Sequence, residues 1–246
     1  MSSDQFQTAT GRQIPAVTAA EMREVDRVAV EEVGLQVLQM MENAGRALAW
    51  HVRDIGDSPV VVVAGNGGNG GGGLVCARHL ANRGVTVEVI LDRPAADLTG
   101  AAAHQFETLS AMDVPTHETV NDVLQSREPS VIVDALVGYG LEGALRTPAS
   151  TLVDAITMAG RGETSVVSLD VPSGRNATTG NAFVPVVEPD RTVTLALPKT
   201  GLDCGVGRLF LADIGMPAVV YERAGITYDS PFEDGDWIEL TPSESV

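Results

Sequence analysis

The stretch VVVVAGNGGNGGGG, residues 60–73, decides the fold of this 246-residue chain. Its first five residues form an apolar, β-branched run, which is typical of a strand buried on both faces of a parallel sheet. A glycine-rich loop over Gly65–Gly73 follows, and the sequence predicts a helix from Leu74 to about Asn82. A strand, a glycine loop and a helix in this order predict an open α/β sheet that binds its ligand beyond the carboxyl ends of the strands.

Apolar β-branched runs and helix-periodic stretches alternate along the rest of the chain. Strands are predicted at Val85–Leu91, Val131–Asp134, Ser165–Asp170 and Thr192–Leu197, with further short strands at Leu209–Ala212 and Trp237–Leu240. Helices are predicted at Ala101–Met112, Val120–Ser126 and Ala149–Ala159. This alternation predicts right-handed βαβ units and a mostly parallel central sheet with helices on both faces, a three-layer α/β/α Rossmann-like fold.

Two amphipathic helices are predicted before the strand at Val60. Thr18 and Glu21 form a capping-box pattern at the start of the first, which continues to Val33. Gly34 separates it from the second, which runs from about Leu35 to Val52. We expect one domain over residues 1–246, with residues 1–17 as a loose polar arm and residues 228–246 as an acidic, turn-rich tail.

The composition limits the partners and the compartment. A formal net charge of -17 argues against binding to nucleic acid or anionic membranes, which need a cationic surface. Lys199 is the only lysine among 16 basic residues, and whether this acidic, lysine-poor composition reflects a high-salt cytoplasm stays open. Cys76 and Cys204 suggest neither a disulfide framework nor a zinc site. The sequence shows no secretory signal or membrane-spanning run, so the expected location is cytoplasmic.

The glycine loop is the first candidate for ligand binding. With few side chains and a helix N-terminus behind it, it suits a phosphate group, although a flexible turn is the alternative. Gly65, Gly67 and Gly70 also fit the pattern G-x-G-x-x-G, with Asp92 after the next strand. That pattern keeps an ordinary NAD-dependent dehydrogenase as a competing hypothesis.

Two aspartates at strand ends are the other candidates. Asp134 and Asp170 each end an apolar strand, where a structural turn or loop cap is the alternative role. Their like charges would repel each other unless a cation or a hydroxyl-bearing substrate lay between them. Asn69, Asp134 and Ser173 offer hard oxygen ligands, which suit an alkali or alkaline-earth cation.

Several motifs together resemble the NAD(P)HX epimerases, the YjeF N-terminal domain family. They are LQMMENAGRALA (38–49), GNGGNGGGGLVCARHL (65–80), VDALVGYGL (133–141), LDVPSG (169–174), TLALPKTGL (194–202) and ADIGMP (212–217). The resemblance implies an isomerase of nicotinamide nucleotide repair, which interconverts the R and S epimers of hydrated NADH and NADPH. It further implies a stand-alone epimerase, a bound potassium ion, a small-molecule substrate (NADHX or NADPHX) and a homodimer.

The resemblance also implies residue roles. The potassium ligands would be Asn69, Asp134 and Ser173. Asp170 would contact the substrate and is the candidate for proton transfer at the hydrated ring. The other expected substrate contacts are Gly68, Asn69, Gly70, Gly71, Gly72, Gly138, Tyr139, Gly140, Leu141, Glu142, Gly143 and Ala144. Lys199 could meet a phosphate, but a surface or packing role is the preferred interpretation.

The sequence departs from the family pattern in the glycine loop. Asn66 replaces a proline, Gly68 replaces an asparagine, and Gly72 replaces an aspartate; Tyr139 replaces a threonine and could stack on the nucleotide. Because the Gly72 change removes a polar group, a catalytically impaired nucleotide-binding or scaffold protein is the alternative function.

Overall fold

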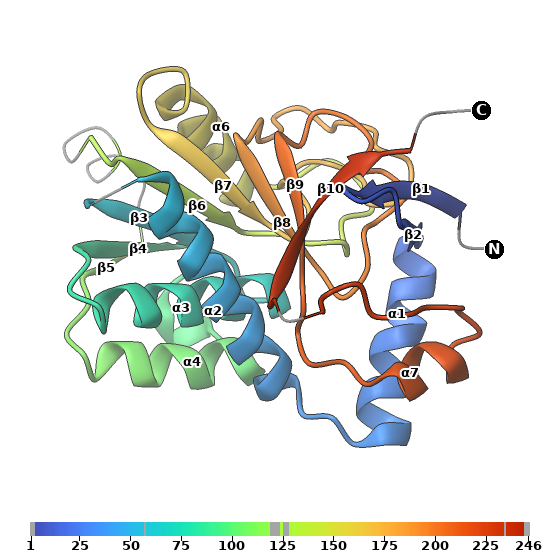
Figure 1. Cartoon of the computed structure of the whole chain (residues 1–246). Coiled ribbons are helices and arrows are strands. Elements are labelled where there is room, and N and C mark those ends of the chain that lie inside the picture. Colours follow the sequence, from blue (N-terminus) through green and yellow to red (C-terminus); the bar gives the residue numbers. More distant parts are fainter. Residues whose placement is uncertain (1–2, 57, 119–123, 125–127, 234, 244–246) are drawn as a thin grey trace.

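The protein, described here from a computed structural model, is built on a 10-stranded sheet in the order β2-β1-β10-β9-β8-β7-β6-β3-β4-β5 (Figure 1). The structure describes residues 3–56, 58–118, 124, 128–233 and 235–243. Neighbouring strands from β9 to β5 pair parallel, whereas β10, β1 and β2 pair antiparallel. The predicted mostly parallel α/β fold is confirmed, while the extent of the domain stays a prediction.

The strand bounds agree closely with the sequence pattern in the centre of the sheet. The strands are β1 (Ser3–Thr8), β2 (Gln13–Ala16), β3 (Val60–Ala64), β4 (Val87–Leu91), β5 (Thr116–His117), β6 (Val131–Ala135), β7 (Ser165–Leu169), β8 (Arg191–Leu195), β9 (Arg208–Ala212) and β10 (Trp237–Pro242). β3 is paired with β4 on one side and with β6 on the other. The chain therefore reverses its direction of travel across the sheet at β3, which is where open α/β sheets form their ligand crevice.

Helices cover both faces of the sheet (Figure 1). The alternating residues of β3 divide between them: Val62 packs in the core under α2, α3 and α4, and Val63 packs in the core under α6. α1 and α7 pack in a third apolar cluster with part of α2. The bounds are α1 (Ala19–Arg27), a π-helical continuation (Val28–Val33), α2 (Val37–Ile55), α3 (Gly68–Ala81), a 3-10 turn (Ala95–Asp97), α4 (Gly100–Ser110), α6 (Ala149–Ala159) and α7 (Ala218–Arg223).

The predicted loose arm at residues 1–17 is wrong. β1 and β2 pair with each other there, and β1 also pairs with β10, so two strands come before the two predicted helices. Phe6 and Ile14 are buried and anchor this hairpin in an apolar cluster. Because Phe6 stands between polar residues in β1, a half-covered sheet edge resembles a loose segment in the sequence.

Other local predictions have mixed outcomes. The Thr18–Glu21 capping box and the strand near Trp237 are confirmed. β5 and α7 were not predicted, and the predicted helix Val120–Ser126 lies almost wholly outside the described residues. α3 begins at Gly68 and not at Leu74, because tight packing against α2 outweighs the low helix propensity of glycine.

His51 is a buried histidine beneath an aromatic cluster. Its ring lies 4.6 Å from the ring of Phe210 and 4.8 Å from that of Trp237, and its Nδ1 lies 2.9 Å from Arg191 Nη1. Since the guanidinium only donates, Nδ1 accepts and the ring is neutral. Burial, followed by the charge of Arg191, lowers the pKa of His51 to about 3.

This shift predicts a loss of stability in acid. Below about pH 6.5 the unfolded chain binds a proton at this residue, and the folded chain does not until about pH 3. Stability should therefore fall as pH decreases through this window, by at most about 1.4 kcal/mol per pH unit. Urea unfolding at pH 7.5 and pH 5 should show a larger loss for the wild type than for His51→Gln. Equal losses would contradict the buried neutral ring.

Candidate active site

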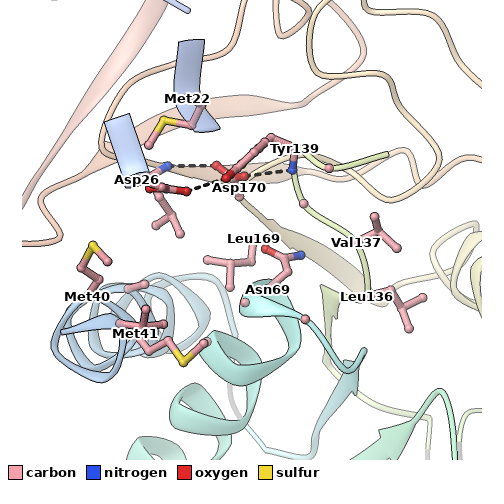
Figure 2. A pocket seen from close by; sticks show the side chains of 18 of the residues that line it. Met22, Asp26, Met40, Met41, Asn69, Leu136, Val137, Tyr139, Leu169 and Asp170 are labelled. Carbon is pink, nitrogen blue, oxygen red and sulfur yellow. Dashed lines mark hydrogen bonds between the residues drawn. The ribbon is translucent and has the colours of Figure 1, made fainter. Parts of the chain in front are cut away.

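A cavity of about 720 Å³ lies beyond the carboxyl ends of the parallel strands (Figure 2). Residues from α1, α2 and the start of α3 line it, together with the segments that follow β4, β6, β7 and β8. Its volume is within the range of sites for drug-sized ligands. The crevice expected from the strand order is therefore present and open, with side chains of several predicted site residues in its wall.

The glycine stretch contributes both to the cavity wall and to its support. Gly68, Asn69 and Gly72 line the cavity, but Gly70 and Gly71 do not. A Cβ atom on Gly70 would lie 1.6 Å from the carbonyl oxygen of Gly65, so this glycine permits the sharp entry into α3. The N-terminus of α3 faces the cavity and is suited to a phosphate group.

Asp170 lies at the end of β7 with its backbone at φ +66°, in the left-handed region. Its Oδ1 accepts from Lys199 Nζ, from Leu195 N at 3.3 Å and from the Thr194 hydroxyl at 3.4 Å. Its Oδ2 accepts from Tyr139 N at 3.2 Å. The side chain is thus held in one orientation at the cavity wall by donors from three segments.

Lys199 is buried and forms an ion pair with Asp170. Its Nζ also donates to the Leu195 carbonyl at 2.9 Å and to the Thr194 hydroxyl at 3.4 Å. These three acceptors use the three protons of the ammonium group, so none is left for a phosphate. The packing role expected for Lys199 is therefore confirmed, and a position on the surface is wrong. The Lys199 ammonium is the cation that balances the charge of Asp170.

Asp134 and Ser173 form a second, fully buried cluster beneath the cavity wall. Asp134 accepts from the Ser173 hydroxyl at 2.6 Å, from Ser173 N at 2.8 Å and from the Ser168 hydroxyl at 2.8 Å. Burial raises the pKa of Asp134, although these hydrogen bonds act in the other direction. All of these donors are neutral, so the carboxylate lacks a cationic partner among the described residues.

Asn69 stands in the cavity wall. Its Oδ1 lies beside Gly138, where a Cβ would be 3.1 Å from it and 3.0 Å from Asp170 Oδ2. Its Nδ2 is buried without a hydrogen-bond partner in the described part of the chain. No hydrogen bond among the described residues joins Asn69 to Asp134 or Ser173, so the structure brings two of the three predicted ligands into contact.

The loop after β6 contributes three of its seven predicted substrate contacts. Gly138, Tyr139 and Gly140 line the cavity, whereas Leu141, Glu142, Gly143 and Ala144 do not. Glu142 is highly exposed and pairs with Arg23 at 3.1 Å. The phenol hydroxyl of Tyr139 donates to Oδ2 of Asp26 on α1, and this hydrogen bond fixes the orientation of the Tyr139 ring (Figure 2).

Sequence reasoning missed the wall that α1 and α2 supply. Met22, Asp26, Met40 and Met41 all line the cavity. The spacing of Met22 and Asp26, one helical turn apart, places them on one face of α1. That spacing is the available signal in the sequence, but a methionine at helical spacing is usually a core residue, so the sequence alone does not single out Asp26.

Comparison with known proteins agrees with this geometry. Residues 37–201 match the family described as YjeF-related protein N-terminus. The chain belongs to this family. It is 42% identical to an NAD(P)H-hydrate epimerase of Dehalogenimonas lykanthroporepellens, over 97% of this chain and 98% of that protein. The resemblance drawn from the motifs is therefore confirmed.

Other relatives of the YjeF family support the same assignment. An NAD(P)H-hydrate epimerase of Weissella koreensis is 36% identical, with 84% of this chain and 95% of that one covered. The crystal structure of the yeast protein ynu0 (YNL200c) superposes with a TM-score of 0.78 at 25% identity, covering 91% of this chain and 99% of that chain. A bifunctional NAD(P)H-hydrate repair enzyme of Salinibacter ruber is 37% identical over 85% of this chain, which spans 42% of that enzyme.

No helix within the described residues is long and apolar enough to cross a membrane.

Proposed function

We propose that this protein is an NAD(P)H-hydrate epimerase, which interconverts the R and S forms of hydrated NADH and NADPH. The observation that carries the proposal is the position of Asp170: a carboxylate held by four donors in the wall of a cavity of about 720 Å³, beside the glycine-rich start of α3. Relatives that align over nearly their whole length carry this name.

The cavity wall provides the groups that such a substrate needs. The N-terminus of α3 would bind the phosphates, because its free backbone N–H groups and helix dipole favour negative charge. Asp170 would face the hydrated ring, where a carboxylate stabilises positive charge as the hydroxyl departs.

Asn69, Asp134 and Ser173 would hold a potassium ion. Their oxygen donors suit this ion. The feature that fits it is the buried carboxylate of Asp134, which has no cationic partner within the described part of the chain. When bound, the ion would offset that charge and stiffen the loop that begins at Val137, whose N–H donates to Ser173 Oγ at 3.1 Å.

Potassium should therefore stabilise the protein specifically. We expect saturating potassium chloride to raise Tm about 5–10 °C above its value in lithium chloride or choline chloride at equal ionic strength. Thermal unfolding followed by circular dichroism would measure the difference. Equal Tm values in the three salts would contradict a potassium site and would leave only a general salt effect on an acidic surface.

The glycine at position 72 favours the alternative function, a catalytically impaired nucleotide-binding protein. Gly72 lines the cavity where the family has an aspartate, and a Cβ there would lie 2.8 Å from Leu169 Cδ2. That contact is with the end of a flexible side chain, so Gly72→Asp can be accommodated. If the wild type is inactive and Gly72→Asp gains activity, the missing carboxylate explains the impairment.

A coupled assay tests the proposed function directly. R-enriched NADH hydrate is supplied with a purified S-specific dehydratase, and NADH recovery is followed with and without the protein. We expect recovery well above the spontaneous rate of epimerisation. Recovery at the spontaneous rate would favour the impaired protein, and steady oxidation of a metabolite by NAD would instead favour a dehydrogenase.

The cytoplasmic location and the homodimer are also proposals. The first rests on the sequence expectation of a cytoplasmic location and the second on the family resemblance; size-exclusion chromatography with light scattering tests the second. A mass of 25.7 kDa, that of one chain, would contradict the dimer.

A further inference from the structure

The cavity wall contains a second carboxyl group, that of Asp26, in addition to the carboxylate of Asp170. Asp26 projects from α1 into the wall shared with Tyr139, Asp170 and Lys199 (Figure 2). Tyr139 joins the two carboxylates, because its backbone N–H donates to Asp170 and its hydroxyl donates to Asp26. Asp26 and Asp170 therefore face one site with different partners.

The partners of Asp170 restrict what it can do. Its two oxygens already accept from an ammonium group, two backbone N–H groups and a hydroxyl. A carboxylate committed in this way can stabilise positive charge, but it is poorly placed to carry a proton to a departing hydroxyl. Epimerisation by loss and return of a hydroxyl group needs a proton donor, so another group must supply it.

Asp26 meets the requirements for that donor. Within the described residues it has one hydrogen-bond partner, Tyr139, and forms no ion pair. Burial raises the pKa of Asp26, with the hydrogen bond from Tyr139 and the charge of Lys199 acting the other way and the charge of Asp170 adding to the increase. An elevated pKa favours the protonated form that a general acid requires.

We propose that Asp26 is the general acid of the epimerase reaction and that Tyr139 positions its carboxyl group; this inference rests on the proposed function. Protonated Asp26 gives its proton to the substrate hydroxyl, and the carbon–oxygen bond breaks with its electron pair leaving on water. The lone pair of the adjacent ring nitrogen forms a C=N bond.

The return step restores both the substrate and the enzyme. Water adds to the other face of the planar cation, and the C=N electron pair returns to nitrogen. The proton lost by the added water passes to the solvent, from which Asp26 is protonated again. One hydroxyl group is lost and one is regained, so the stereocentre is inverted without a net change in oxidation state.

The decisive variant is Asp26→Asn. Its amide oxygen can still accept from the Tyr139 hydroxyl, so a merely structural role predicts unchanged kinetics. A general acid predicts that kcat falls at least about 100-fold while KM stays within about threefold. Glu24→Gln is the matched control, since it makes the same chemical change at an exposed position of α1 and should leave kcat unchanged.

Two further variants keep the test decisive if Asp26→Asn folds poorly. In Asp26→Ala, added formate should restore part of kcat, which a structural role would not allow. Tyr139→Phe should lower kcat about tenfold, because the carboxyl group remains but loses its orienting partner. An active wild type with Asp26→Asn within threefold of it, or with only KM raised, would overturn the inference. A wild type no faster than spontaneous epimerisation would instead overturn the proposed function.

Discussion

Lys199→Met is expected to destabilise the protein by about 3–5 kcal/mol, because it leaves Asp170 buried without its cationic partner. Both residues are almost completely inaccessible to water, at 1% and 4% relative exposure. Methionine fills a similar volume, so the loss should come from the missing charge and hydrogen bonds and not from a cavity. Urea unfolding monitored by tryptophan fluorescence would give the change in free energy.

A double-mutant cycle provides the control. Asp170→Asn/Lys199→Met removes both charges, so it should recover much of the stability lost in Lys199→Met. Arg208→Met, which breaks an exposed pair with Glu239, should cost no more than about 1 kcal/mol. If Lys199→Met costs as little as Arg208→Met, the buried ion pair is not a determinant of stability.

The choice of lysine at this position has a physical reason. Every other basic residue of the chain is an arginine or, in four places, a histidine. At position 199 three acceptors converge on one point, which a compact ammonium can satisfy and a planar guanidinium cannot. The backbone is held as well, because Val17 N donates to the Pro198 carbonyl at 2.9 Å. The segment expected to be a loose arm thus helps to position the lysine.

The parts of the site that lie at strand ends could be predicted from the sequence. An apolar run followed by an aspartate identifies both the strand and the edge where its side chain emerges, which is why Asp134 and Asp170 were found. Ser173 and the glycine stretch follow strands in the same way. In a parallel sheet these positions converge without any knowledge of side-chain packing.

The contacts between distant segments could not be predicted in this way. Asp26 and Tyr139 are 113 positions apart, and their hydrogen bond depends on how α1 packs over the loop after β6. The burial of Lys199 likewise depends on a turn after β8, where Ala196 has φ +61°. Helical or strand periodicity reports which face of an element is apolar, but it does not report which polar side chains will meet across a cavity.

Gly70→Ala is expected to cost more than about 3 kcal/mol of folding free energy, beyond the usual range for overpacking. The added Cβ would lie 1.6 Å from the carbonyl oxygen of Gly65 and 2.8 Å from its nitrogen. Both atoms belong to the backbone, so no side-chain rotation relieves the clash. The gain of about 1 kcal/mol in helix propensity is too small to offset it.

Gly67→Ala is the matched control for this prediction, because it makes the same change three residues earlier. A Cβ on Gly67 would meet no atom of the described residues within 4 Å, and φ there is -97°, so alanine fits and the change in stability should stay within about 1 kcal/mol. Urea unfolding of the two variants should therefore differ by at least about 2 kcal/mol. Equal stabilities would mean that α3 can move away from Gly65 at little cost in free energy. The part of the cavity wall formed by the N-terminus of α3 would then be deformable and not preorganised.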